Sequence, residues 1–161
     1  MSQLTIALAC DLSGFALKQA VAEHLRGKPE VAVLDLGIDS EEKPAPYFEQ
    51  APKVARAIQE GRAEKGILIC GTGQGMAIVA NKHKGIYACV ATDLFSGERA
   101  KIINNANVIT LGGWVTAPFL ATQIIDAYLA VSFTQKMEFK KDFLTHAFNQ
   151  VKALEERNFA R

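Results

Sequence analysis

The sequence predicts an α/β fold: a doubly wound, five-stranded parallel sheet in three α/β/α layers, with an additional C-terminal tail helix. Two patterns support this class. Short apolar runs alternate along the chain with amphipathic stretches of helical spacing. The runs are apolar on both faces, as strands are when helices cover both sides of a sheet. Right-handed crossovers between such strands give a doubly wound sheet, for which we expect the strand order 2-1-3-4-5.

The expected elements alternate regularly along the chain. The first apolar run stops at Asp11 and is followed by a segment of helical spacing. Four more strands alternate with helices, and Pro118 suits the first turn of the last helix in this series. The predicted strands are residues 4–10, 31–36, 66–70, 85–91 and 107–111. The predicted helices are residues 15–26, 51–60, 74–82, 94–103 and 118–131, with a proline-containing loop at 37–46.

Beyond these elements, a set of apolar residues recurs at helical intervals and predicts the tail helix. The set is Phe139, Phe143, Ala147, Val151 and Leu154. The core has enough helices without this one, so it packs either on its own domain or on a second subunit. No repeat, low-complexity segment or linker divides the chain, which predicts a single domain over residues 1–161.

Composition and charge exclude several classes of protein. Hydrophobic residues make up 49% of the chain and charged residues 22%, which is typical of a globular protein. A net charge of +1 gives no basic excess for nucleic acid, and no apolar run is long enough for a membrane. The chain begins without a basic leader, and Cys10, Cys70 and Cys89 have no metal-like spacing. We therefore expect a cytoplasmic protein with reduced thiols and no metal site.

The topology predicts where a ligand binds. In a doubly wound sheet, ligands bind at the carboxyl ends of the strands, where the direction of winding reverses. In the expected order this reversal lies between the first and third strands. The loops after Cys10 and Ile69 should therefore lie side by side, which makes Asp11 and Cys70 neighbours in the expected pocket.

A glycine-rich loop, Cys70-Gly71-Thr72-Gly73-Gln74-Gly75-Met76, follows the third strand and opens a helix. Glycine permits positive φ and close approach to a ligand, and the free N–H groups of a first helical turn suit an anion. The alternative is a tight turn without a ligand.

Nucleotide-binding motifs fit this loop poorly. A dinucleotide site requires G-x-G-x-x-G after the first strand, whereas the spacing here is G-x-G-x-G after the third, although Asp93 could contact a ribose. No Gly-Lys-Ser/Thr ends the run, so it is not a P-loop. A phospho-receiver domain would need an Asp after the third strand and a Lys after the fifth, where this chain has Cys70 and Gly112-Gly113.

Cys70 is a candidate base. A thiol just before a helix can be activated by the N–H groups of the first turn. A thiolate beside N–H donors can take a proton next to a carbonyl while the donors hold the enediolate oxygen, without metal or organic cofactor. The alternative is a buried, inert cysteine, which suits Cys89 in mid-strand better than Cys70 at a strand end.

These motifs closely resemble the ribose-5-phosphate isomerase B and galactose-6-phosphate isomerase family over most of the chain. The segment at 66–76 carries the resemblance, followed by Ala80-Asn81-Lys82 and Lys84-Gly85-Ile86. Three shorter pieces occur in the family's order: Ala9-Cys10-Asp11, Pro46-Tyr47 and the run at 104–109.

The resemblance implies a metal-free and cofactor-free aldose–ketose isomerase of phosphorylated sugars, active as a homodimer or a homotetramer. It implies that Cys70 transfers the proton, that the loop from Gly71 to Met76 holds the enediolate, and that Thr72 helps to open or orient the sugar. It also implies that four further positions contact the substrate, and that the neighbouring subunit supplies Asn104. The set is Asp11, Leu12, Tyr47 and Asn104.

The chain departs from the family pattern at both expected histidines. Where the family has Cys-Asp-His, this chain has Cys10-Asp11-Leu12. Where the family has His-Asn-Asp, this chain has Ile103-Asn104-Asn105. His24, His83 and His146 match neither position.

The phosphate-binding arginines of the family are also replaced. Lys141 matches one of them and Met137 the other, with Lys136 and Lys140 close by. The three lysines are candidate phosphate ligands, or else a solvated basic face.

The missing ring-opening histidine leaves three hypotheses. The substrate is a short open-chain sugar phosphate, such as a tetrose, which needs no ring opening. Alternatively, the chain is the B-type subunit of a hetero-oligomeric galactose-6-phosphate isomerase, whose homologous partner supplies the histidine. The third possibility is a non-catalytic protein that binds a sugar phosphate or a nucleotide, which the retention of Cys70 and its loop disfavours.

Overall fold

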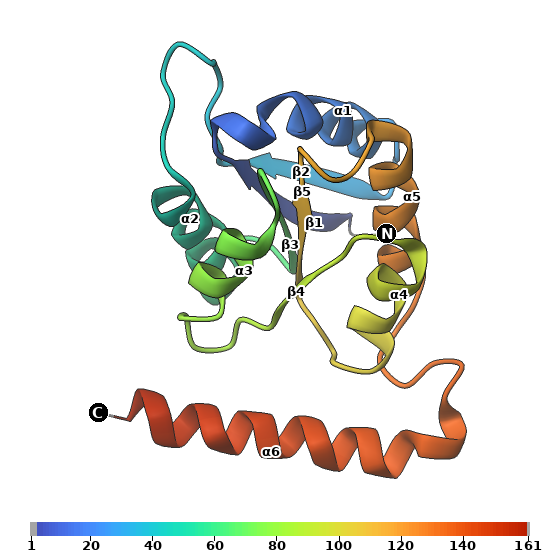
Figure 1. Cartoon of the computed structure of the whole chain (residues 1–161). Helices are drawn as coiled ribbons and strands as arrows, with labels where there is room; N and C mark the ends of the chain where they lie inside the picture. The colour runs from blue at the N-terminus through green and yellow to red at the C-terminus, as the bar shows by residue number, and fades with distance from the viewer. Residues whose placement is uncertain (1–2, 161) are drawn as a thin grey trace.

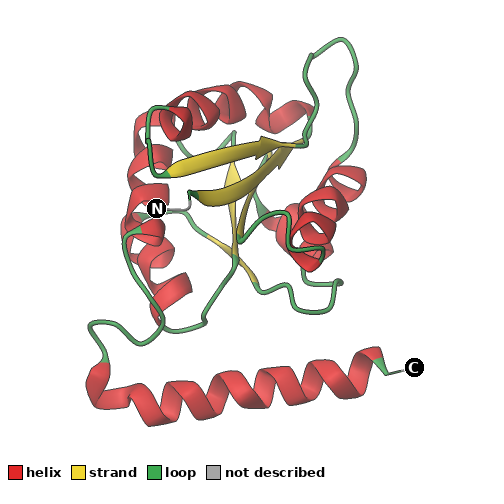
Figure 2. Ribbon diagram, turned by 180° about the vertical axis from the view of Figure 1, so that it is seen from behind, coloured by secondary structure: helices red, strands yellow, loops and turns green. Residues whose placement is uncertain are grey.

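Parallel strands form the centre of the computed structural model, which describes residues 3–160 (Figures 1 and 2). The strands are β1 (Leu4–Cys10), β2 (Val31–Asp35), β3 (Lys65–Cys70), β4 (Ala88–Val90) and β5 (Val108–Gly112). The helices are α1 (Phe15–Arg26), α2 (Tyr47–Gln59), α3 (Gln74–Ala80), α4 (Leu94–Ile102), α5 (Pro118–Leu129) and α6 (Lys141–Phe159). Two short 3-10 turns, η1 (Leu12–Gly14) and η2 (Glu138–Lys140), precede α1 and α6.

Helices cover both faces of the sheet, as the apolar strands predict. Helices α1, α4 and α5 pack on one face around a core that includes Leu17, Ile109 and Tyr128. Helices α2 and α3 pack on the other face around a second core with Val54 and Met76. The α/β class, the parallel sheet and the three layers are confirmed.

The strand order is β2-β1-β3-β5-β4, so the predicted order 2-1-3-4-5 is wrong in its last two strands. The burial of the two strands explains the exchange. All five residues of β5 are buried, which suits an interior position, whereas β4 has only three residues, each half-buried, which suits an edge. The exchange places the carboxyl end of β5 directly beside that of β3.

Two predicted boundaries shift for local reasons. Helix α2 begins at Tyr47 rather than at residue 51, because Pro46 has an extended backbone and caps it. Strand β4 begins only at Ala88, because Gly85 has a φ of +78° and Ile86 donates to His83 O in a turn.

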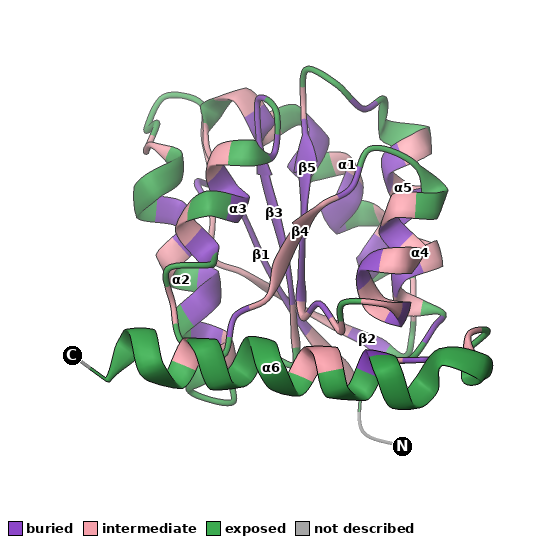
Figure 3. Ribbon diagram, turned by 60° about the horizontal axis from the view of Figure 1, so that its bottom comes forward, coloured by how far each residue is buried: buried purple, intermediate pink, exposed green. Residues whose placement is uncertain are grey.

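The tail helix is present as α6 and lies across the amino end of the sheet, along the lower edge of Figure 1. It touches its own domain through Phe148, whose ring centroid lies 5.0 Å from that of Tyr87, and through Glu155, which accepts hydrogen bonds from Tyr87 Oη and Gly85 N. Only Leu144 of this helix is buried, and most of its surface is exposed in Figure 3. None of the helices in residues 3–160 is long and apolar enough to cross a membrane.

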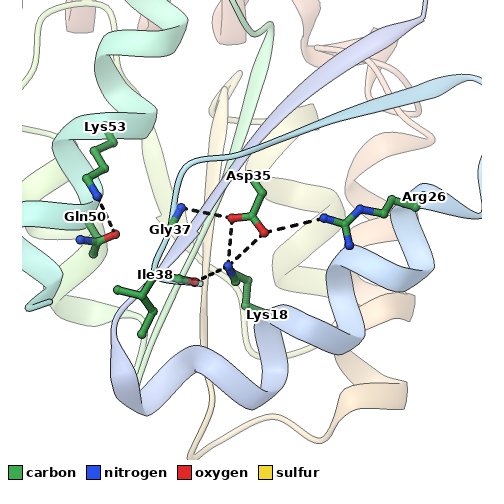
Figure 4. Close-up of polar contacts among 7 residues, drawn as sticks. All are labelled: Lys18, Arg26, Asp35, Gly37, Ile38, Gln50 and Lys53. Carbon is green, nitrogen blue, oxygen red and sulfur yellow. Dashed lines mark hydrogen bonds and ion pairs between the residues drawn. The ribbon is translucent and has the colours of Figure 1, made fainter. Parts of the chain in front are cut away.

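An ion pair between the buried Lys18 and the half-buried Asp35 holds the start of the loop at 36–46 (Figure 4). Lys18 of α1 is 2% exposed, and its Nζ donates to both carboxylate oxygens of Asp35 at 2.9 and 3.0 Å and to Ile38 O at 2.7 Å. Gly37 N donates to the same carboxylate at 3.1 Å. One ammonium group thus holds together α1, the end of β2 and the first turn of the loop.

Replacing Lys18 should therefore destabilise the fold. Lys18→Met leaves the Asp35 carboxylate without its buried partner, and we expect the free energy of unfolding to fall by about 3 kcal/mol. Arg26→Met is the matched control, because Arg26 also faces Asp35, at 3.9 Å, but is 59% exposed; its loss should cost less than about 1 kcal/mol. Urea unfolding at a single protein concentration measures both, and equal effects would contradict the assignment.

Candidate active site

The carboxyl ends of β1, β3 and β5 meet at one edge of the sheet. Asp11 N, just after β1, donates to Ile69 O at 3.2 Å, and Gly113 N, just after β5, donates to Cys70 O at 2.7 Å. Asp11 and Cys70 line the same cavity of about 330 Å³. The predicted juxtaposition of the loops after Cys10 and Ile69 is confirmed.

Glycines let the three loops approach one another this closely. A Cβ on Gly14 would lie 2.5 Å from Ile69 O, and a Cβ on Gly113 would lie 2.5 Å from Ser13 O. Both distances are shorter than carbon and oxygen tolerate, so the backbones occupy the space where side chains would start. The site therefore depends on Gly14 and Gly113 although neither carries a reactive group.

Cys70 ends β3 with its side chain 5% exposed. Its Sγ accepts a hydrogen bond from Gly73 N at 3.2 Å, and Gly73 has the left-handed φ of +80° that directs this amide back at the sulfur. An N–H donor aimed at sulfur is complementary to the charge of a thiolate. Elsewhere in the sheet, burial raises the pKa of Cys10 to about 12 and also raises the pKa of Cys89.

The loop after Cys70 presents further polar groups to the cavity. Thr72 Oγ1 accepts a hydrogen bond from Gln74 N at 3.3 Å, so its own proton is available to a ligand. The first hydrogen bond along α3 runs from Ala77 N to Gly73 O, which leaves the amide of Gly75, a residue that lines the cavity, without an acceptor inside the helix. These groups suit a negatively charged oxygen.

The cavity gathers half of the predicted site residues. Asp11 accepts hydrogen bonds at Oδ1 from Ser13 Oγ at 2.6 Å and Gly14 N at 3.1 Å, which fixes its carboxylate. The Tyr47 ring packs against Gly75, where an added Cβ would lie 2.9 Å from the ring. The predicted residues that line the cavity are Asp11, Tyr47, Cys70, Gly71, Thr72, Gln74 and Gly75.

Two predicted residues sit beside the cavity. Leu12 lines an adjoining cavity of about 560 Å³, together with Pro44, Ala45 and Pro46. Met76 is fully buried in the core under α3 and lines neither cavity.

The remaining predicted residues lie apart from Cys70 within one chain. Asn104 precedes β5, at the amino end of the sheet, and lines a groove of about 240 Å³ beneath α6. Lys140 and Lys141 lie at the start of α6, and Lys136 is paired with Glu98. A single chain therefore does not bring these four residues to the thiol.

Sequence reasoning missed Trp114, which lines both cavities. It also missed Ser13 and Ile78 in the smaller cavity. The available signal for Trp114 was its place directly after Gly112-Gly113 at the end of a strand. The expected strand order put another strand between this end and Cys70, whereas in the structure β5 pairs directly with β3.

The family model described as Ribose/Galactose Isomerase matches residues 6–144. The chain belongs to this family. It is 42% identical to the 4-deoxy-4-sulfo-D-erythrose isomerase of Clostridium sp. (strain MSTE9), over 95% of this chain and 96% of that protein. It is 42% identical to the D-erythrulose-4-phosphate isomerase of Pectobacterium atrosepticum, over 81% and 85%.

Solved structures of the family agree with the fold. Ribose-5-phosphate isomerase B of Clostridium thermocellum superposes with a TM-score of 0.88 at 30% identity, covering 96% of this chain and 99% of that one. The protein is thus an isomerase of the ribose/galactose isomerase family, as the motifs around Cys70 predict.

The Gly73 amide provides a test of the site geometry. Gly73→Ala adds left-handed strain of about 1–2 kcal/mol, and the new Cβ would lie 3.1–3.2 Å from the Leu111 backbone, so the loop must shift. Because the shift moves the amide from Cys70 Sγ, we expect iodoacetamide to alkylate Cys70 several-fold more slowly. Peptide mass spectrometry measures the rate.

Gly61→Ala is the matched control, since Gly61 has a φ of +70° with nothing within 4 Å of the added Cβ. It should show the loss of stability due to left-handed strain alone, with no change in Cys70 alkylation. An unchanged alkylation rate in Gly73→Ala would contradict the role given to this amide.

Proposed function

We propose that the protein interconverts the aldose and ketose forms of a four-carbon sugar that carries an anionic group on its last carbon. The observation that carries the proposal is the Cys70 thiol, which faces a cavity rich in amide donors and lined by no histidine among the described residues. A four-carbon aldose whose terminal hydroxyl is blocked cannot close a five-membered ring. Its open chain needs no ring-opening acid.

The histidines of the chain support an open-chain substrate. His24 is paired with Asp126 between α1 and α5 at 2.9 Å, His83 contacts Val79 O at 3.1 Å, and His146 lies on α6. Two of the relatives support the same substrate length, since both are named for four-carbon sugars, one a sulfo sugar and one a phosphate.

The groups around Cys70 suit an enediolate mechanism. The thiolate takes the proton from C2 of the aldose, the C–H electron pair forms a C1–C2 double bond, and the carbonyl electrons move to O1. The free amides of the loop stabilise the negative oxygen. Return of the proton to C1, with transfer of the O2 proton to O1, yields the ketose, and the Thr72 hydroxyl is placed to relay that second proton.

The anionic end of the substrate requires positive charge that one chain does not place at this site. Asp11 is the one charged side chain among the described residues that line the two cavities. Lys140 and Lys141 are exposed at the start of α6, and Asn104 lies at the opposite end of the sheet. We propose that a second copy of the chain, in a dimer or tetramer, brings these residues to Cys70.

The test of this function is the conversion of D-erythrose 4-phosphate and its 4-sulfo analogue by the protein purified alone. We expect turnover of at least one of them, and Cys70→Ala should lower kcat by 100-fold or more, on the order of the contribution of a general base. Cys10→Ala is the matched control, since the Cys10 thiol is fully buried, and should retain activity.

Other results would replace the proposal. Turnover of D-galactose 6-phosphate only after a homologous subunit is added would identify a B-type subunit of a hetero-oligomer. Binding without turnover in every case would identify a non-catalytic sugar-phosphate protein.

The shared site predicts complementation between two inactive variants. Cys70→Ala lacks the base, and the double variant Lys140→Ala/Lys141→Ala lacks the charge for the anion. Random mixing of the two chains in a dimer would leave about one quarter of the sites intact. We expect the mixture to recover about that fraction of wild-type activity after refolding together.

The control mixes each variant with itself, which should recover no activity. A mixture no more active than its components would show that Cys70 and the lysines do not act together across an interface.

A further inference from the structure

Trp114 is the one tryptophan of the chain, and its side chain is 76% exposed. It follows β5, and its backbone is tied to the Cys70 loop, because Trp114 N donates to Gly71 O at 3.0 Å and the preceding Gly113 N donates to Cys70 O at 2.7 Å. The backbone of Trp114 is therefore fixed beside the strand that ends in Cys70.

The indole ring lies directly on the backbone of Gly71. A Cβ added to Gly71 would lie 2.7–2.8 Å from the indole atoms Cε3, Cδ2 and Cζ3. The ring thus occupies the space next to the residue that follows the thiol. Its large exposed area faces the site, since Trp114 lines both the cavity of about 330 Å³ and the one of about 560 Å³.

Trp114 stands where the two cavities join. Asp11 and Ser13 are the other residues that both cavities share, so the junction runs between the indole and the turn after β1. The smaller cavity contains Cys70, and the larger one extends to the loop at 44–46. A sugar whose reacting carbons lie at Cys70 must pass the indole to extend in that direction.

We infer that Trp114 determines the length of sugar that the site accepts. Its indole forms a wall at the junction, which admits a four-carbon chain and obstructs the additional carbons of a five- or six-carbon chain. The inference rests on the proposed function for its substrate class. Trp114 is a specificity-determining residue that contacts the substrate and acts through its shape, because indole carries no charge.

A proline-containing loop forms the other side of the larger cavity. On the far side of the larger cavity lie Pro44 and Pro46, whose rings fix their backbone φ. The loop that contains them is fastened at its start by Lys18 and Asp35. A longer sugar would therefore meet the ring seated on Gly71 on one side and the proline-containing loop on the other.

The experiment measures binding of polyol phosphates, which have no carbonyl and cannot be isomerised. Isothermal titration of the intact protein with erythritol 4-phosphate, ribitol 5-phosphate and sorbitol 6-phosphate gives the preference for chain length. We expect the wild type to prefer the four-carbon ligand by about tenfold or more, as one poorly accommodated carbon costs. Trp114→Ala should bring this ratio close to one, and Trp114→Phe should give an intermediate value.

Phe119→Ala is the matched control. Phe119 is also a largely exposed aromatic residue, 79% exposed, five positions further along the chain, and it lines neither cavity. It should keep the wild-type ratio. If Trp114 had a purely structural role, Trp114→Ala would lower the affinity for all three ligands equally and leave their ratio unchanged. That result would overturn the inference.

Turnover separates this inference from the proposed function. The ratio of kcat/KM for D-erythrose 4-phosphate to that for D-ribose 5-phosphate should fall in Trp114→Ala in parallel with the binding ratio. Absence of turnover in the wild type overturns the proposed function, while the binding ratios still decide the role of Trp114. Because Trp114 is the sole tryptophan, erythritol 4-phosphate should also change the intrinsic fluorescence of the wild type, and an unchanged spectrum would contradict the contact.

Discussion

The close approach of three backbones at the carboxyl ends of β1, β3 and β5 is the constraint on which the site depends. Gly14 lies against Ile69, Gly113 against Ser13, and Gly71 beneath the Trp114 indole. Hydrogen bonds between the same loops, such as that from Gly113 N to Cys70 O, lock this arrangement. These backbone contacts bring together the three residues that carry the Asp11 carboxylate, the Cys70 thiol and the Trp114 indole.

Much of the fold could be predicted from the sequence because apolar runs and helical spacing are local properties. The strands, the helices on both faces and the meeting of Asp11 with Cys70 follow from such patterns and from the rules of doubly wound sheets. The order of the last two strands is not local. It depends on which strand can be buried on both sides. The fully buried β5 lies in the interior of the sheet, and the short, half-buried β4 lies at its edge.

The same distinction explains which site residues could be found in advance. The loop after Cys70 is continuous in sequence, and its motif identifies it. Trp114 lies beside this loop only because β3 pairs with β5. The predicted strand order did not place these two strands next to each other. Asn104 and the lysines at the start of α6 lie outside the cavity of their own chain. Their relation to Cys70 depends on how chains associate, which no periodicity within one chain encodes.

The backbone and the side chain of Trp114 have separate roles. Its backbone amide serves the architecture, whereas its side chain is exposed and contributes little to the core. Any residue that has an amide can make the bond to Gly71 O, so substitutions at this position leave the fold largely intact. Evolution can therefore sample new side chains here one codon at a time, without first acquiring compensating mutations elsewhere in the domain.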